Sequence, residues 1–189
     1  MARALKVGVP VVAVVALLCC SVAAVTAVAQ TQKHPINGGS VSAPPLRWTA
    51  SAVPFMLEQG GSSILIDVFD RGGTKVITYG ANHVRVASRR SIRATEFRPP
   101  RTRPSRNAIV AGVVGARVRR VRVEFRSGPS RSFRTVAAPR DWPRANYRFF
   151  VVGTTVAARH RTARKLTTRI DGFNSSGRRI ARQRTITSF

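Results

Sequence analysis

The chain has 189 residues, 33 of them lysine or arginine and seven acidic, which gives a formal net charge of +26. This length suits one domain plus a targeting segment, and about 160 residues can bury a sizeable core without disulfides. The charge favours anionic partners, and the scarcity of acids makes a hydrolase the least favoured function class. All but four of the basic residues are arginine, a bias that either phosphate binding or a GC-rich genome produces.

The N-terminal 29 residues predict an export signal. Arg3 and Lys6 precede an uncharged apolar stretch from Val7 to Ala29, which ends in small residues of the kind found at signal cleavage sites. We expect cleavage after Ala29. The alternative is that residues 7–29 stay as a single transmembrane anchor helix, because about 20 apolar residues suffice to cross a bilayer. In both cases the rest of the protein lies outside the cytoplasm, secreted or anchored in the cell membrane.

The only cysteines, Cys19 and Cys20, lie inside this apolar stretch. The domain that follows it therefore has no disulfide, no thiol nucleophile and no cysteine-based zinc site.

Residues 30–46 are rich in Gly, Ser, Pro and Asn and poor in large apolar side chains, which predicts a flexible linker. His34 would then be a solvated histidine of that linker. Folded structure is expected from Arg47 onward, beginning with a short strand that runs to Val53 and stops at Pro54.

The first predicted hairpin consists of residues 63–70 and 74–79, which flank Arg71-Gly72-Gly73. A three-residue loop of this kind needs glycine where the backbone turns left-handed. The pattern places Val68 opposite Val76. The acids near the turn lack the spacing of a calcium loop, so we expect a turn that opens with aspartate.

Prolines and arginines dominate residues 88–107, and this composition predicts a long exposed loop, because proline cannot donate to a strand ladder. Mobile arginines can each displace a counterion from a phosphate or carboxylate polymer. The alternative is a solvated crossover that only connects two sheets. The candidate polyanion contacts are the seven arginines of this loop: Arg89, Arg90, Arg93, Arg98, Arg101, Arg103 and Arg106.

Residues 108–137 predict the central β-hairpin. Its first strand alternates valine or phenylalanine with arginine or glutamate, which is typical of a strand with one buried and one exposed face. With a short connecting loop, Phe125 faces Phe133, and Glu124 lies opposite Arg134 on the exposed face.

Two further elements are predicted in the C-terminal third. Residues 147–152 carry apolar side chains on both faces, which indicates a strand buried on both sides. Residues 165–173 and 178–186 form a last hairpin, in which Asp171 lies opposite Arg179.

No catalytic motif is present. His34, His83 and His160 share no metal-ligand spacing, and the chain has no nucleophile-elbow, phosphate-loop or zinc-protease motif. We therefore expect no catalytic residues, no metal and no cofactor.

Several segments resemble a group of uncharacterised exported domain proteins of high-GC actinobacteria. The resemblance covers roughly residues 109–183 and implies an exported β-sandwich with no catalytic residues to transfer. It rests on Gly112-Val113-Val114, Val118 to Phe125 with Gly128, Arg148 to Val152, and Asp171 to Ile180.

These patterns predict an all-β antiparallel sandwich, Ig-like or related, of seven to nine strands over residues 47–189, preceded by the signal or anchor helix. The function favoured by the charge is a non-enzymatic, extracytoplasmic interaction module that contacts anionic cell-envelope polymer or lipid headgroups. Extracellular nucleic-acid binding is the alternative, although no recognition motif supports it. An uncharacterised hydrolase ranks third, and a pocket joining His83 or His160 to an acid would favour it.

Overall fold

A computed structural model gives an all-β fold, as predicted, with almost no helix. No helix in the part of the chain that it describes is long and apolar enough to cross a membrane. The predicted signal or anchor, residues 1–29, lies outside that part. The described residues are 33–54, 61–84, 91–99, 106–126, 130–142, 146–157, 159, 165–184 and 186–188.

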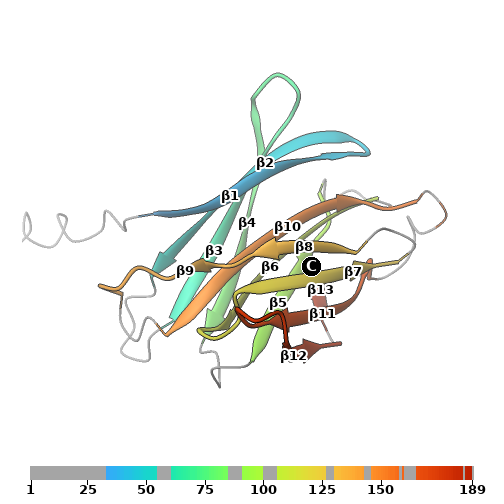
Figure 1. Ribbon diagram of the computed structural model, residues 1–189. Helices are drawn as coiled ribbons and strands as arrows, with labels where there is room; N and C mark the ends of the chain where they lie inside the picture. The colour runs from blue at the N-terminus through green and yellow to red at the C-terminus, as the bar shows by residue number, and fades with distance from the viewer. Residues whose placement is uncertain are drawn as a thin grey trace, which may run out of the picture. The chain divides into compact units, whose positions relative to one another are not determined.

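The described strands form three sheets (Figure 1). In the N-terminal sheet, four strands pair antiparallel in chain order. These strands are β1 (His34–Ser42), β2 (Pro45–Pro54), β3 (Gly61–Phe69) and β4 (Lys75–Val84).

The middle sheet has the order β13-β5-β6-β10-β9, antiparallel except between β13 and β5. Its strands are β5 (Ile92–Phe97), β6 (Asn107–Gly115), β9 (Val136–Ala137), β10 (Tyr147–Thr155) and β13 (Thr187–Ser188).

The C-terminal sheet has the order β12-β11-β7-β8 and is antiparallel throughout. Its strands are β7 (Arg120–Phe125), β8 (Arg131–Arg134), β11 (Thr167–Phe173) and β12 (Arg179–Gln183).

Two hydrophobic cores lie on opposite faces of the middle sheet. Ile109 and Val113 of β6 belong to the core shared with the N-terminal sheet, whereas Val110 and Val114 belong to the core shared with the C-terminal sheet. All nine residues of β6 are buried. A strand covered on both faces reads as a continuous apolar run, and the sequence of β6 has this form.

Strand β10 divides its side chains in the same way. Phe149 and Val151 enter the first core, and Phe150 and Val152 enter the second. The prediction that residues 147–152 are buried on both sides is confirmed. The structure contains one more sheet and more strands than the predicted sandwich, because both faces of the middle sheet need a cover.

The predicted linker of residues 30–46 differs from the structure, since His34–Ser42 forms β1. Its glycines allow close packing: a Cβ at Gly39 would lie 2.9 Å from Cζ2 of Trp48. Asn37 Nδ2 also donates to the carbonyl of Val151, at 2.8 Å. The Gly- and Ser-rich composition of this segment, which is typical of a linker, therefore belongs to a strand that packs against Trp48.

The predicted loop of residues 88–107 also needs correction, because Ile92–Phe97 forms β5 and pairs with β6. Glu96 in this strand is fully buried. Its carboxylate accepts the backbone N–H of Leu166 at 2.9 Å and that of Thr167 at 2.6 Å. This acid therefore fixes the start of β11 against the middle sheet.

The first predicted hairpin forms, and Gly73 adopts φ +84° as its loop requires. A bulge between Val68 and Phe69 shifts the register, however, so that Val68 lies opposite Ile77 and not Val76. Val76 consequently remains half exposed.

The central hairpin also forms with a different register. Phe133 lies opposite Val121, and Phe125 pairs with β11 instead. A shift of the partner by an even number of residues keeps every side chain on its own face, so alternation alone does not distinguish the two registers. Glu124 then forms its ion pair with Arg169 of β11 and not with Arg134.

The last hairpin likewise forms with Asp171 opposite Arg182, not Arg179 as predicted. The partner of Asp171 is thus three residues further along the chain, and the bulge between Gly172 and Phe173 accounts for one of the three.

Replacing Glu96 with glutamine should destabilise the fold by about 1–3 kcal/mol, because the amide loses the charge that strengthens these hydrogen bonds and replaces one accepting oxygen with an NH2 donor beside the buried N–H groups. The free energy of urea unfolding measures this loss. Glu124→Gln is the matched control. It breaks a partly exposed ion pair, for which we expect about 0–1 kcal/mol. Equal losses for the two variants would contradict the role given to Glu96.

Gly153→Ala should also destabilise the fold, by about 1–3 kcal/mol, since the added Cβ would lie 2.5 Å from Nε1 of the buried Trp48. At Gly80 the same Cβ would lie 3.9 Å from Leu65, an ordinary contact. Thermal unfolding of Gly153→Ala beside Gly80→Ala tests this prediction, and a Gly80→Ala loss as large as that of Gly153→Ala would count against it.

Candidate anion-binding groove

The seven arginines predicted to contact a polyanion differ in their exposure to solvent. Arg93 is exposed on β5, whereas Arg98 is buried. Arg106 is half buried, and its Nε donates to the carbonyl of Val156 at 2.9 Å. The remaining four, Arg89, Arg90, Arg101 and Arg103, lie outside the described residues. Of the three that can be placed, only Arg93 therefore offers an exposed cation.

A different set of arginines converges at one end of the C-terminal sheet. Two adjoining hollows of about 500 and 530 Å³ share Arg119, Asn174 and Ser175 in their walls. We call them together the basic groove. The arginines that line it are Arg117, Arg119, Arg120, Arg134 and Arg148, and no acidic or aromatic residue is among the described lining residues.

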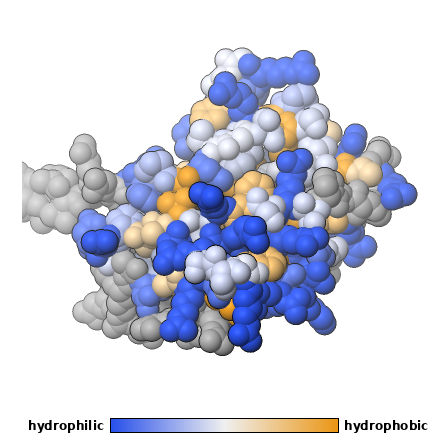
Figure 2. Space-filling model, viewed as in Figure 1, coloured by the Kyte–Doolittle hydropathy of each residue, from blue (hydrophilic) through white to orange (hydrophobic). Residues whose placement is uncertain are grey.

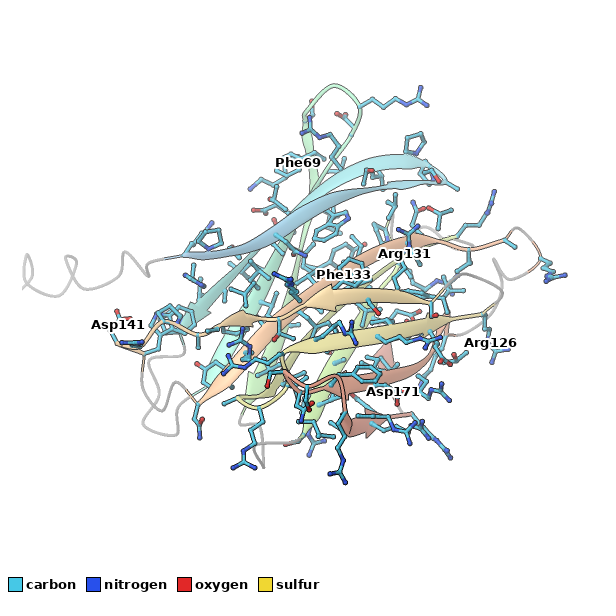
Figure 3. All side chains as sticks on the ribbon, in the orientation of Figure 1. Phe69, Arg126, Arg131, Phe133, Asp141 and Asp171 are labelled. Atoms are coloured by element: carbon cyan, nitrogen blue, oxygen red, sulfur yellow. The ribbon has the colours of Figure 1, made fainter. Side chains whose placement is uncertain are left out.

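Strand pairing explains why the groove contains no acid. In one cross-strand row of the C-terminal sheet, Arg134 lies opposite Arg120, which lies opposite Phe173. The acids Glu124 and Asp171 lie further along β7 and β11, in other rows. Figure 3 labels Asp171 on β11, and Figure 2 shows hydrophilic residues crowded over the face formed by β7, β8 and β11.

Both acids of this sheet are already paired. Glu124 pairs with Arg169, and Asp171 pairs with Arg169 at 3.1 Å and with Arg182 at 2.8 Å. None of the arginines of the basic groove has an ion pair with a carboxylate in the described part of the chain. The two carboxylates of the sheet therefore pair with Arg169 and Arg182, away from the arginines of the basic groove.

Arg148 is held in a fixed orientation. Its Nε donates to Oγ1 of Thr135 and its Nη2 to the carbonyl of Thr135, both at 2.6 Å. Thr135 Oγ1 in turn donates to the carbonyl of Val118 at 2.8 Å. Burial, and secondarily the charge of Arg119, lower the pKa of Arg148, although a guanidinium remains charged at any physiological pH. Three of its five N–H groups remain for a ligand.

Arg120 and Arg134 form the second pair of cations in the groove. They lie directly opposite each other on β7 and β8, where like charges repel. The guanidinium carbon of Arg120 lies 5.4 Å from the centre of the Phe173 ring, a cation–π contact that holds it over the sheet.

The β11–β12 turn, residues 174–177, forms the rim of the groove. Oδ1 of Asn174 accepts the backbone N–H of Arg178 at 2.9 Å, and Gly177 adopts φ +79°. The turn between β3 and β4 has the same arrangement, with Oδ1 of Asp70 accepting the N–H of Thr74 at 2.9 Å. At the same turn position, the β3–β4 turn has the charged Asp70 and the rim of the groove has the neutral Asn174.

The groove could not be found by scanning the sequence for a basic run. Its arginines come from three separate segments, and only the observed register places them together without acids. The predicted registers set Glu124 opposite Arg134 and Asp171 opposite Arg179, which would have neutralised this end of the sheet. The available signal was the cluster of Arg117, Arg119 and Arg120 within four residues, with no acid within three residues of it.

A metal or histidine site has no support in the described ranges. No group of three His, Cys, Asp or Glu side chains that could hold a metal ion occurs among the described residues. The side chains of His83 and His160 lie outside that set.

Comparison with known proteins identifies no relative. No protein-family model, no curated protein and no solved structure matches the chain.

Arg134→Gln should stabilise the protein at low ionic strength by about 0.2–1 kcal/mol, because it removes the repulsion across β7 and β8. The gain should shrink near 1 M salt, where the Debye length is only about 3 Å. Urea unfolding at both salt concentrations measures it. Arg131→Gln at the other end of β8 is the control, and an equal gain there would mean that general net charge is responsible.

Proposed function

We propose that this protein is an exported, non-enzymatic interaction module that binds anionic cell-envelope material, either acidic polymer or lipid headgroups. The basic groove is the observation that carries the proposal. Its unpaired arginines raise the local positive potential, and a groove focuses that potential on an approaching anion. Unpaired cations in one place cost stability, and an anionic ligand offsets this cost.

The groove supports an envelope ligand over a nucleic acid. Proteins that bind single strands stack bases on exposed aromatic rings beside the basic residues. The groove has no aromatic residue among its described lining residues, and the nearby Phe173 is half buried with Arg120 over its ring.

The proposal that the protein is exported rests on the sequence of residues 1–29. We propose that these residues are cleaved or act as an anchor, and that the domain is related to the exported domains of high-GC actinobacteria that it resembles. An Ig-like relationship of the sheets is part of the same proposal.

The test is sedimentation of the full chain, kept in non-ionic detergent, with detergent-extracted bacterial cell wall and separately with DNA-coated beads, from low to high salt. We expect wall binding that persists in excess DNA and weakens as salt rises. Arg117→Gln with Arg119→Gln should reduce wall binding by about tenfold. The control pair, Arg126→Gln with Arg131→Gln, removes the same charge outside the groove and should change it little.

Two outcomes would count against the proposal. If DNA displaces the wall at every salt concentration, nucleic-acid binding is the better account. If neither polyanion binds at physiological salt, the arginine excess is compositional, and the proposed function is wrong.

A further inference from the structure

We propose that the basic groove is a phosphate site, which binds phosphate groups in preference to carboxylates. The inference rests on the proposed function and narrows its ligand. It concerns the chemistry shared by phosphate-bearing wall polymers, lipid headgroups and free phosphate, which all present phosphate oxygens.

The donors of the groove converge from different directions. Arg148 lies on β10 and is held by Thr135, while Arg120 and Arg134 project from the outer face of the C-terminal sheet. A carboxylate has two oxygens in one plane, and a single arginine satisfies it with two parallel hydrogen bonds. A phosphate group has tetrahedrally placed oxygens that can accept from several guanidinium groups at once. Several separate arginines around the basic groove therefore match the tetrahedral oxygens of a phosphate group better than the planar oxygens of a carboxylate.

The rim adds neutral donors. Because Oδ1 of Asn174 accepts from the backbone N–H of Arg178 and from Oγ of Ser176, its Nδ2 group is left to donate. Ser175 is exposed in the wall of both hollows and offers a hydroxyl. Amide and hydroxyl donors beside arginines are the groups that proteins use to contact phosphate oxygens.

Two of the five groove arginines are held in place before any ligand arrives. Arg148 is bonded to Thr135, and Arg120 rests on the ring of Phe173. Little entropy of these two side chains is then lost on binding, and the bound anion relieves the repulsion between Arg120 and Arg134. Phosphate binding should therefore raise the unfolding temperature as well as occupy the groove.

The experiment measures binding of the full chain, in non-ionic detergent, to polyphosphate and to poly-L-glutamate at equal charge concentration and ionic strength. Inorganic phosphate and glycerophosphoglycerol, the soluble headgroup of an anionic lipid, are titrated in parallel, with the unfolding temperature as a second readout. These two arms distinguish free phosphate from a headgroup as the source of the phosphate group.

The groove variant combines Arg120→Gln with Arg134→Gln. The control variant combines Arg126→Gln, directly after the end of β7, with Arg131→Gln at the start of β8, and both residues are labelled in Figure 3. Both variants lower the net charge equally. We expect the groove variant to lose about tenfold or more in polyphosphate affinity, and its salt slope to fall by about 1 for each arginine. The control should stay within about twofold.

The outcomes separate this inference from the proposed function. Polyglutamate binding as tight as polyphosphate binding would overturn the preference for phosphate but leave a polyanion-binding module. Equal losses in the two variants would overturn the groove as the site. Failure of the wild-type chain to bind any of the four probes would overturn both proposals. The unfolding temperature of the groove variant without ligand should not fall, which shows that a loss of binding is not a loss of folding.

Discussion

The middle sheet must be covered on both faces, and the rest of the structure depends on this requirement. Strands β6 and β10 carry apolar side chains in both directions, so exposure of either face would forfeit the burial that stabilises the domain. The N-terminal sheet covers one face, and Trp48 packs there against the backbone at Gly153. The C-terminal sheet covers the other face, and the buried carboxylate of Glu96 holds the start of β11 in place.

The position of the C-terminal sheet in turn sets the surface charge. With one face committed to the core, all the charged side chains that alternate along β7 must lie on the other. The register of β7, β8 and β11 then decides which of them meet. Arg169 lies opposite Glu124, whereas Arg120 lies opposite Arg134, so the same strands produce one row with an ion pair and one row of two cations. A basic groove is thus a consequence of strand pairing, and net charge alone does not locate it.

The strands and turns were predicted from the sequence more accurately than the pairing register between the strands. Alternation and glycine turns were enough to predict the hairpins and the turn at Gly73, and the apolar run at residues 147–152 was enough to predict a strand buried on both sides. Strand β1 was missed because its glycines serve packing against Trp48, and composition does not distinguish that use from flexibility. The registers were missed because alternation repeats every two residues and a bulge adds a residue that it does not encode. The site depends on register, so the site was missed as well.

The two equivalent turns at Asp70 and Asn174 have a consequence for how such a surface can evolve. The same backbone accepts either side chain at this position, because only the shared Oδ1 atom is needed to close the turn. Exchange of an amide for a carboxylate there changes the charge at the rim of the groove without changing the hairpin. Selection can therefore adjust the attraction of this surface for anions in small steps, while the architecture beneath it is inherited unchanged.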